Sequence, residues 1–504
     1  MKQNLNLCTD PWIPVRMRSG ACQRVSLENF FKEARDISDM ILPAHERISV
    51  MRLLICIVQR AINGPHNREE WDECKENIAP CSIAYLKEWR HAFNLIGKDG
   101  AFLQPTCVEA RKGDDWGDMS KISMSLAEGN TPTLFDNAAG SLRRTELWQM
   151  ALDLLAFQNC APGGTIGVVM WNNVQTGTKA PDSAPGGPCI PYSAIHLFVC
   201  GENMLETIWY NLCTCKEFAP FRKGMGKPIW EFMPSGMNDT KAIENATMTY
   251  LGRLVPMSRV VKIAETADKC LTARGLTYPV YSEDKELLYY ESTMSVVLDK
   301  NNSRHIVGAD IYKAMWRNLP ALLHRFSRQS KSFTCMDEQD LPEHYGIWIG
   351  AMVLDQAKVL GPMEDYYEHL DKVHVGHAAD KRQAILMRMA DKGISLVKSA
   401  LMSYYSYINS PFDNKKQVFL HAEKTFWGKL TAKKHIYMRC LGVTAEKPEL
   451  YNAVNSSWGD AICSSAASTF DLLVSRNTVP QLAAWARARQ KLPNNKRIMQ
   501  DNGR

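Results

Sequence analysis

The sequence has 504 residues, of which 45% are hydrophobic and 23% charged, and it carries a net charge of +6 and fifteen scattered cysteines. This length allows two to four domains, and this composition excludes a disordered chain. Apolar runs such as residues 53–58 stop well short of the ~20 residues of a membrane-spanning helix. Because the N-terminus also lacks a signal-peptide core, we expect a cytoplasmic protein whose cysteines are reduced thiols.

The N-terminal part of the chain mixes helical and strand-like segments. Apolar spacing predicts helices over residues 47–62 and 204–212. Residues 195–200, 287–291 and 295–298 are rich in β-branched and aromatic residues and are followed by polar or glycine punctuation, which is typical of strands. We predict a large, irregular mixed α/β domain over residues 1–367.

A loop that could bind another molecule is predicted around residues 130–137. Gly129 and Pro132 shape a turn that presents Phe135, Asp136 and Asn137. An aromatic ring could stack on a base and an asparagine could bond a base edge, as in single-strand and groove readers. The alternative is a surface turn whose Phe135 is tucked into the core.

A glycine loop follows an apolar helical run over residues 147–157. Gly163, Gly164 and Gly167 would let the backbone approach another molecule closely, in conformations that a Cβ forbids. Neither a Lys-Ser/Thr pair nor a G-x-G-x-x-G motif is present, so the loop is not a nucleotide cradle of a known type. A helix C-cap followed by a turn is the alternative.

Two single polar residues are further binding candidates. Lys269 lies on what we predict to be a strand or hairpin edge, and Gln356 lies just before the predicted domain junction. For each the alternative is an ordinary solvated side chain. Neither residue has a motif of its own to decide between the two.

Beyond about residue 368 the strand-like alternation disappears. Phe419, Ala422, Phe426 and Leu430 recur at helical spacing, and Pro480 suits a first helical turn. Residues 371–504 hold 21 Lys and Arg against 10 Asp and Glu (+11), whereas residues 1–370 hold 39 against 44 (−5). We predict an antiparallel four-helix bundle with a basic tail over residues 368–504, and an α+β fold overall. The excess charge indicates a face for a polyanion, with a solvated helix surface as the alternative.

Common enzyme signatures are mostly absent from the sequence. It contains no G-x-x-x-x-G-K-S/T, G-x-S-x-G or H-E-x-x-H motif. The one metal-like spacing is His374-x-x-His377, in the predicted linker. We predict no catalytic residue, no metal site and no cofactor.

Several segments, taken in order, resemble one family, the large subunit of the type I-E CRISPR surveillance complex known as Cascade. Residues 6–15 are similar to its N-terminal Leu-x-x-Asp-x-Trp-Ile-Pro-Val signature. Residues 102–105 resemble its Pro-Phe-Leu-Gln segment, residues 198–211 its strand and helix after the glycine loop, and residues 252–259 its Gly-x-Leu-x-Trp-Gln-Ser-Arg segment. Residues 422–427 look like the Ala-Glu-x-x-Phe-Tyr helix of its bundle.

The resemblance implies a non-catalytic subunit. It would recognise the short protospacer-adjacent motif (PAM) in double-stranded DNA, help start strand separation and R-loop formation, and provide the docking surface for a separate helicase-nuclease. The implied partners are the backbone, small and guide-processing subunits of Cascade, the CRISPR guide RNA, the double-stranded target DNA and the helicase-nuclease, with no membrane.

The resemblance also implies roles for single residues. The glycine loop, with Gly163, Gly164, Thr165 and Gly167, would approach the PAM from the minor groove. Lys269 would be a lysine finger in that groove and Gln356 a wedge at the point of strand separation. Phe135, Asp136 and Asn137 would anchor the subunit near the 5′ handle of the guide and the PAM. Thr165 and Ile166 among the glycines imply a PAM preference of this chain's own.

Two other classes of function stay open at this stage. One is a stand-alone, metal-dependent nucleic-acid-processing enzyme whose acidic residues converge only in the fold. It would cleave nucleic acid by itself with magnesium or manganese. The other is a protein-interaction scaffold that never touches DNA, against which the basic C-terminal region argues.

Overall fold

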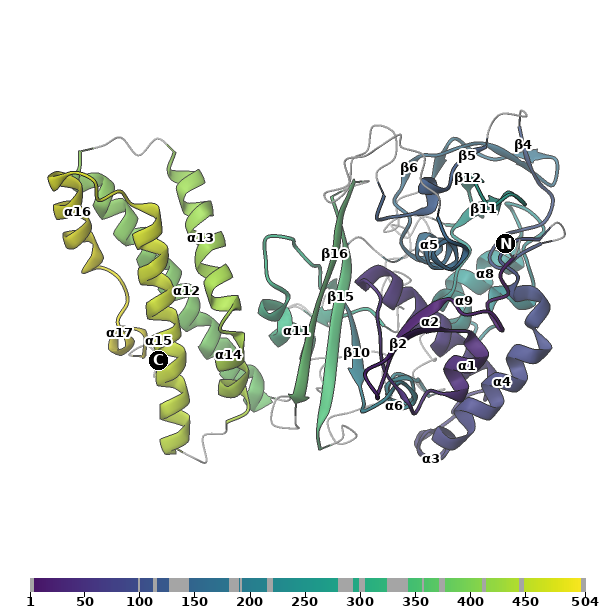
Figure 1. Ribbon diagram of the computed structural model, residues 1–504, viewed down its shortest axis with the longest axis horizontal. Coiled ribbons are helices and arrows are strands. Elements are labelled where there is room, and N and C mark those ends of the chain that lie inside the picture. The colour runs from purple at the N-terminus through teal and green to yellow at the C-terminus, as the bar shows by residue number, and fades with distance from the viewer. Residues whose placement is uncertain are drawn as a thin grey trace. The chain divides into compact units, whose positions relative to one another are not determined.

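The computed structural model describes residues 4–97, 100–111, 116–126, 145–180, 190, 193–214, 221–279, 293–298, 304–323, 343–355, 358–370, 377–409, 414–443 and 448–499 (Figure 1). Contacts divide the chain into two compact units. Unit 1 comprises the described residues up to Ala309 together with Tyr345–Glu368. Unit 2 comprises the described part of the segment that begins at Asp310 and the chain from His369 on.

Unit 1 combines small sheets with helices of varied length. Its strands are β1 (Ile13–Met17), β2 (Cys22–Val25), β3 (Ile37–Met40), β4 (Val108–Ala110), β5 (Gly117–Asp118), β6 (Gly164–Thr165), β7 (Val169–Trp171), β8 (Val174–Gln175), β9 (Lys179–Ala180), β10 (His196–Cys200), β11 (Arg259–Ile263), β12 (Lys269–Arg274), β13 (Val296–Leu298), β14 (Arg304–Ile306), β15 (Tyr345–Asp355) and β16 (Lys358–Leu370). They form sheets in the orders β2-β1-β3, β10-β15-β16, β11-β12-β5 and β4-β7-β8, and the pairs β13-β14 and β6-β9.

The helices of unit 1 are mostly short. They are α1 (Leu27–Lys32), α2 (Ala44–Ala61), α3 (Arg68–Glu73), α4 (Ile78–Glu88), α5 (Leu147–Cys160), α6 (Met204–Tyr210), α8 (Thr240–Met248) and α9 (Tyr250–Leu254), with 3-10 turns that include η3 (Met119–Ile122). The predicted helices at 47–62 and 204–212 and the strands at 195–200 and 295–298 are thereby confirmed within a few residues. The strand predicted at 287–291 lies outside the described residues.

Helix α2 is the central element of unit 1. It is buried along almost its whole length and packs against α4, α5, α9 and β15. Its buried Arg52 donates from Nε to the carbonyl of Leu254 (2.8 Å) and from Nη2 to that of Arg253 (2.6 Å). Because these carbonyls lie at the end of α9, the guanidinium satisfies acceptors that a helix C-terminus leaves open. A cation inside the core therefore joins two helices about 200 positions apart in sequence.

Two buried carboxyl groups share one amide where α2 meets α5. Gln149 donates from Nε2 to Glu46 (2.8 Å) and to Asp153 (3.3 Å). Burial raises the pKa of Asp153 to about 7, and burial together with the charge of Asp153 raises the pKa of Glu46 to about 7. Both carboxyl groups therefore bind their protons more tightly in the folded chain than in the unfolded one.

We expect Asp153→Asn to stabilise the protein in a pH-dependent way. An acid whose folded pKa exceeds its unfolded value destabilises the fold as pH rises from the unfolded pKa, near 4, through the folded one, near 7. At pH 8 the variant should be more stable than the original chain by ~2–4 kcal/mol, and at pH 4 by less than ~1 kcal/mol. Urea denaturation at both pH values measures this difference. Exposed Asp36→Asn is the control, and equal shifts at both pH values would contradict the explanation.

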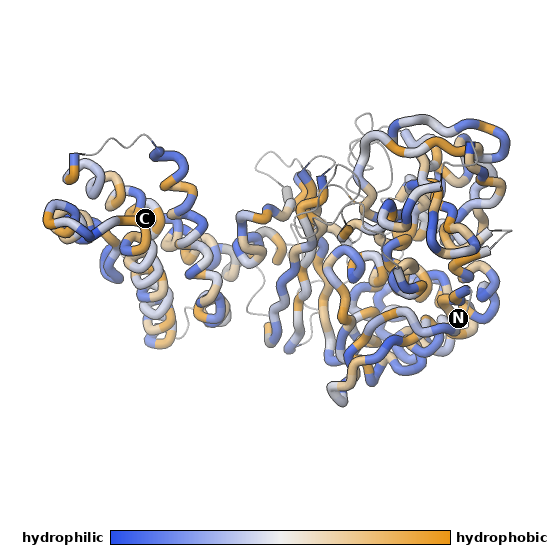
Figure 2. Tube along the Cα trace, turned by 45° about the horizontal axis from the view of Figure 1, so that its top comes forward, coloured by the Kyte–Doolittle hydropathy of each residue, from blue (hydrophilic) through white to orange (hydrophobic). Residues whose placement is uncertain are grey.

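Unit 2 is a helical bundle. Its elements are η5 (Met315–Asn318), α11 (Leu319–Leu323), α12 (His377–Tyr407), α13 (Lys415–Thr431), α14 (Lys434–Leu441), α15 (Pro448–Leu473), α16 (Val479–Arg489) and α17 (Asn495–Met499). Along the long helices, hydrophobic and hydrophilic stretches alternate (Figure 2). Such alternation gives each helix one face for the core of the bundle. The predicted α+β class with C-terminal helices is confirmed.

Hydrogen bonds fix the directions of the bundle helices. Arg382 near the start of α12 donates to Asn455 near the start of α15, and Tyr404 near the end of α12 donates to Ser475 just after α15. These two helices are therefore parallel. Helices α14 and α16 run the opposite way, since the successive contacts of each with α15 proceed toward its N-terminus. Helix α13 is antiparallel to α12, because Glu423 bonds Lys398 whereas Phe426, further along α13, lies beside Gly393, earlier in α12. Consecutive long helices are thus antiparallel, as predicted.

An aromatic cluster fills one part of the bundle core. The ring of Trp316, from η5, lies 5.0 Å from that of Tyr437, 6.0 Å from Trp427 and 6.2 Å from Trp458, measured between centroids. Its indole Nε1 donates to the hydroxyl of Thr431 (3.0 Å). The segment around Trp316 therefore packs as part of unit 2, although it precedes β15 and β16 in sequence. None of the described helices is long and apolar enough to cross a membrane.

Candidate nucleic-acid interface

The glycine loop leaves the end of α5 and forms a short exposed strand. Helix α5 is capped by Ala161, whose N–H bonds the carbonyl of Phe157, so the glycines do not cap it. Gly164 and Thr165 form β6, which pairs with β9 so that Thr165 lies opposite Lys179. Gly164 is exposed and has φ +119°, a conformation that strains any residue with a Cβ. The loop presents its backbone to the surroundings.

Gly167 occupies a position where a side chain does not fit. A Cβ at this residue would lie 2.5 Å from the carbonyl oxygen of Thr272, in strand β12. That oxygen belongs to the backbone of a paired strand and cannot rotate away. Close packing on β12 therefore requires glycine here, and the far end of the loop is fixed to the β11-β12-β5 sheet.

The near end of the loop is held by two buried polar side chains. Arg259, which is 1% exposed, donates from Nη2 to the carbonyls of Pro162 (3.2 Å) and Ala161 (3.4 Å), and from Nη1 to that of Ser258 (2.9 Å). The amide of Gln158 accepts from the backbone N–H of Arg259 and donates to its carbonyl, both at 2.9 Å. The guanidinium thus links the loop to β11, so both ends of the loop rest on one sheet.

Strand β12 begins with Lys269, the predicted lysine finger. Lys269 is exposed at the first position of β12 and pairs with Asp118 of β5. Thr272, which contacts Gly167, lies three residues further, roughly 10 Å along the strand. Neighbouring Asp268 is exposed, and the hydroxyl of Thr266 together with the charge of Lys269 lowers its pKa. The structure therefore brings the glycine loop and Lys269 to one sheet, at the end of unit 1 where β4, β5, β6, β11 and β12 gather (Figure 1).

The chain matches the family described as CRISPR-associated protein Cse1 over residues 6–467. The chain belongs to the Cse1 family. The resemblance drawn from its sequence, to the large subunits of type I-E CRISPR surveillance complexes, is confirmed.

Individual relatives agree with this assignment. The CasA/Cse1 protein of Thermus thermophilus is 26% identical over 381 residues, which cover 72% of this chain and 71% of that protein. A crystal structure of CasA from the same organism superposes with a TM-score of 0.74 at 18% identity, covering 99% of both chains. A chain of a CRISPR RNA-guided surveillance complex superposes with a TM-score of 0.69 at 14% identity, covering 97% of this chain and 99% of that one. At these identities the solved structures establish the fold.

Four of the residues predicted for Cse1-like roles lie outside the described residues. These are Phe135, Asp136, Asn137 and Gln356. The described chain brackets Gln356 closely, since β15 ends at Asp355 and β16 begins at Lys358. Among the described residues no group of three or more His, Cys, Asp or Glu could hold a metal ion.

A basic groove lies beside the glycine loop of this Cse1-family chain. It is a cavity of about 400 Å³ whose lining includes Arg111, Trp116, Lys121, Ile166, Gly167 and Thr272. No sequence pattern indicated it, because its walls come from segments up to about 160 positions apart. Gly167 and Thr272 belong both to this groove and to the contact that holds the loop.

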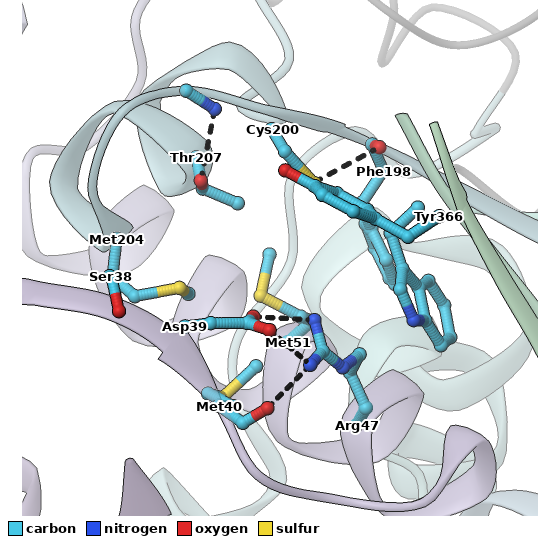
Figure 3. Close-up of a pocket in the computed structure, with 12 residues that line it drawn as sticks. Ser38, Asp39, Met40, Arg47, Met51, Phe198, Cys200, Met204, Thr207 and Tyr366 are labelled. Carbon is cyan, nitrogen blue, oxygen red and sulfur yellow. Dashed lines mark hydrogen bonds and ion pairs between the residues drawn. The ribbon is translucent and has the colours of Figure 1, made fainter. Parts of the chain in front are cut away.

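A second cavity in unit 1 is structural. Its volume is about 20 Å³, enough for one water molecule (Figure 3). Arg47 reaches into it and bonds both carboxylate oxygens of Asp39 (2.7 and 2.9 Å) and the carbonyl of Met40, with Trp348 beneath its guanidinium. Burial raises the pKa of Cys200 in its wall to about 12, so this thiol is not reactive. The cavity lies between β3, α2, β10 and β15 and is too small for a ligand.

Proposed function

We propose that this chain is the non-catalytic large subunit of a type I-E CRISPR RNA-guided surveillance complex, and that it recognises the PAM in double-stranded DNA. The supporting observation is the exposed glycine loop, with Gly164 at φ +119°, which is fixed at both ends to the sheet that carries Lys269. A loop with three glycines in five residues, fixed at both ends, is suited to contact a groove through its backbone.

Minor-groove recognition fits this chemistry. The minor groove is about 6 Å wide and offers acceptors that barely distinguish A·T from T·A, so a narrow backbone loop and one long cation can read it with a relaxed code. Gly163, Gly164, Thr165 and Gly167 would lie along the groove, and Lys269 would donate to base or sugar acceptors. We therefore expect selection at a few positions of the target DNA, with several related PAM sequences accepted.

We also propose that the chain helps to start strand separation. Gln356 would be inserted beside the PAM, at a cost of a few kcal/mol for unstacking a base step. Pairing of the guide RNA with the opened strand offsets that cost, because heteroduplex formation is a nearly balanced exchange once a seed exists. Phe135, Asp136 and Asn137 would hold the subunit near the 5′ handle of the guide. The proposed partners are the other Cascade subunits, the guide RNA, the target DNA and the helicase-nuclease.

Removing the amine of Lys269 should weaken PAM selection. We expect the guide RNA complex assembled with Lys269→Ala to lose most of its preference at the positions flanking the protospacer, with a drop of roughly 10-fold for the favoured sequence. The measurement is binding to a target library randomised at those positions, with complexes that contain the original chain, the variant or no chain. Lys87→Ala, at an exposed lysine of α4, is the charge-matched control.

Two outcomes would overturn the proposal. One is a library selection that is the same with and without this chain. The other is cleavage of DNA or RNA by the isolated chain with magnesium or manganese, abolished by a chelator, which would make the chain a metal-dependent enzyme.

A further inference from the structure

The basic groove has a composition suited to a nucleic-acid strand. Of the described residues that line it, Arg111 and Lys121 are cationic and none is acidic. Ile166 and Trp116 add apolar surface, and both are partly exposed. Cations beside apolar and aromatic surface are what a sugar-phosphate backbone and its bases require. The volume of about 400 Å³ lies within the range of about 300–1,000 Å³ that is typical of small-molecule sites.

Lys121 is positioned by its surroundings. A Cβ at Gly117 would lie 2.3 Å from Cε of Lys121, so the lysine stem crosses the backbone of β5 where no side chain intervenes. The turn η3 that carries Lys121 is itself fixed, because the carboxylate of Asp118 accepts from the N–H of Ser120 (2.8 Å). Both the stem of Lys121 and the turn that carries it are therefore held in place beside the groove.

We propose that the basic groove binds the phosphate backbone of the DNA strand that borders the glycine loop, with Arg111 and Lys121 as the phosphate contacts. This rests on the proposed function. A loop that enters a minor groove about 6 Å wide is flanked by a row of phosphates on either side. Gly167 is part of the loop and also part of the wall of the basic groove, so a strand on that side of the loop meets both cations.

Such contacts affect DNA affinity without affecting sequence preference. A phosphate contact positions the protein and releases counterions, so its loss weakens binding to every sequence alike and lowers the salt dependence. Contacts by Lys269 or the glycine loop, in contrast, are proposed to discriminate between sequences. The two kinds of residue can therefore be separated in one binding assay.

The test uses the assembled guide RNA complex with Arg111→Gln, Lys121→Gln or both. Its affinity for target duplexes with a favoured and a disfavoured PAM is measured between about 50 and 200 mM salt. We expect each substitution to weaken binding to both duplexes by roughly 3- to 10-fold and to reduce the slope of log K against log salt by about one. Lys121→Arg should restore the slope. Lys32→Gln, at an exposed lysine of α1, should leave it unchanged.

The outcomes separate this inference from the proposed function. If the original complex selects a PAM but neither Gln variant changes the salt slope, the basic groove does not bind the backbone. If the original complex shows no selection at all, the proposed function fails first. A third result, micromolar binding of AMP by the isolated chain that is lost in Arg111→Gln, would make the groove a site for free nucleotides and overturn its assignment to DNA.

Discussion

Arg259→Met will destabilise unit 1 by ~2–4 kcal/mol and will abolish PAM selection by the complexes that still assemble. Methionine retains the length and apolar character of the stem but removes the donors to Ala161, Pro162 and Ser258. Hydrogen bonds from a charged group contribute about 1.5–3 kcal/mol each when the acceptor is left buried without a partner, and part of this is returned because a buried cation is also removed. The glycine loop then loses its attachment to β11.

Arg52→Met is the matched control for this effect. Arg52 is also fully buried, and it also donates to backbone carbonyls, those of Arg253 and Leu254, at the end of α9. Urea denaturation of the isolated chain should show a comparable loss of stability for both variants. Only Arg259→Met should flatten the selection of a randomised target library at a temperature where both complexes are folded. Equal selection by the two variants would show that Arg259 supports the fold without shaping the loop.

The local elements of this protein could be predicted from its sequence because they depend on neighbours in the chain. Helical spacing located α2 and α6, and three glycines located the exposed loop between α5 and β7. The order of short family segments indicated the fold. A resemblance over most of the chain implies how segments far apart in sequence pair, which periodicity cannot predict. The confirmed predictions are therefore those that depend on a few consecutive residues or on an ordered series of motifs.

The support of the loop could not be predicted, because its partners are far apart in sequence. Gln158 and Arg259 are 101 positions apart and no spacing rule connects them. A buried arginine is also uncommon enough that its burial is not inferred from sequence. Sequence analysis also missed Thr272, because its backbone carbonyl, and not its side chain, limits the space at Gly167. Trp316 likewise joins the aromatic core of the bundle from a segment that precedes β15 and β16.

Gly167→Ala should weaken binding of the assembled complex to its favoured target by at least ~10-fold, or about 1.4 kcal/mol, while the isolated chain stays folded. The added Cβ would lie 2.5 Å from the carbonyl oxygen of Thr272, closer than any real contact. Because Thr272 is paired with Val261 of β11, and β12 is also paired with β5 at Lys269 and Cys270, we expect the loop and not the strand to move. A shift of this kind displaces the backbone that is proposed to enter the minor groove.

Gly236→Ala is the control, since a Cβ there meets nothing within 4 Å and the residue needs no positive φ. Thermal denaturation should show a loss of no more than ~1–2 kcal/mol for Gly167→Ala, because a loop can relax where a core cannot. Binding that is unchanged for Gly167→Ala would mean that the position of the loop against β12 is irrelevant to DNA. Since Gly167 also forms part of the basic groove, a variant that loses both PAM preference and salt dependence would indicate that loop and groove hold the same duplex.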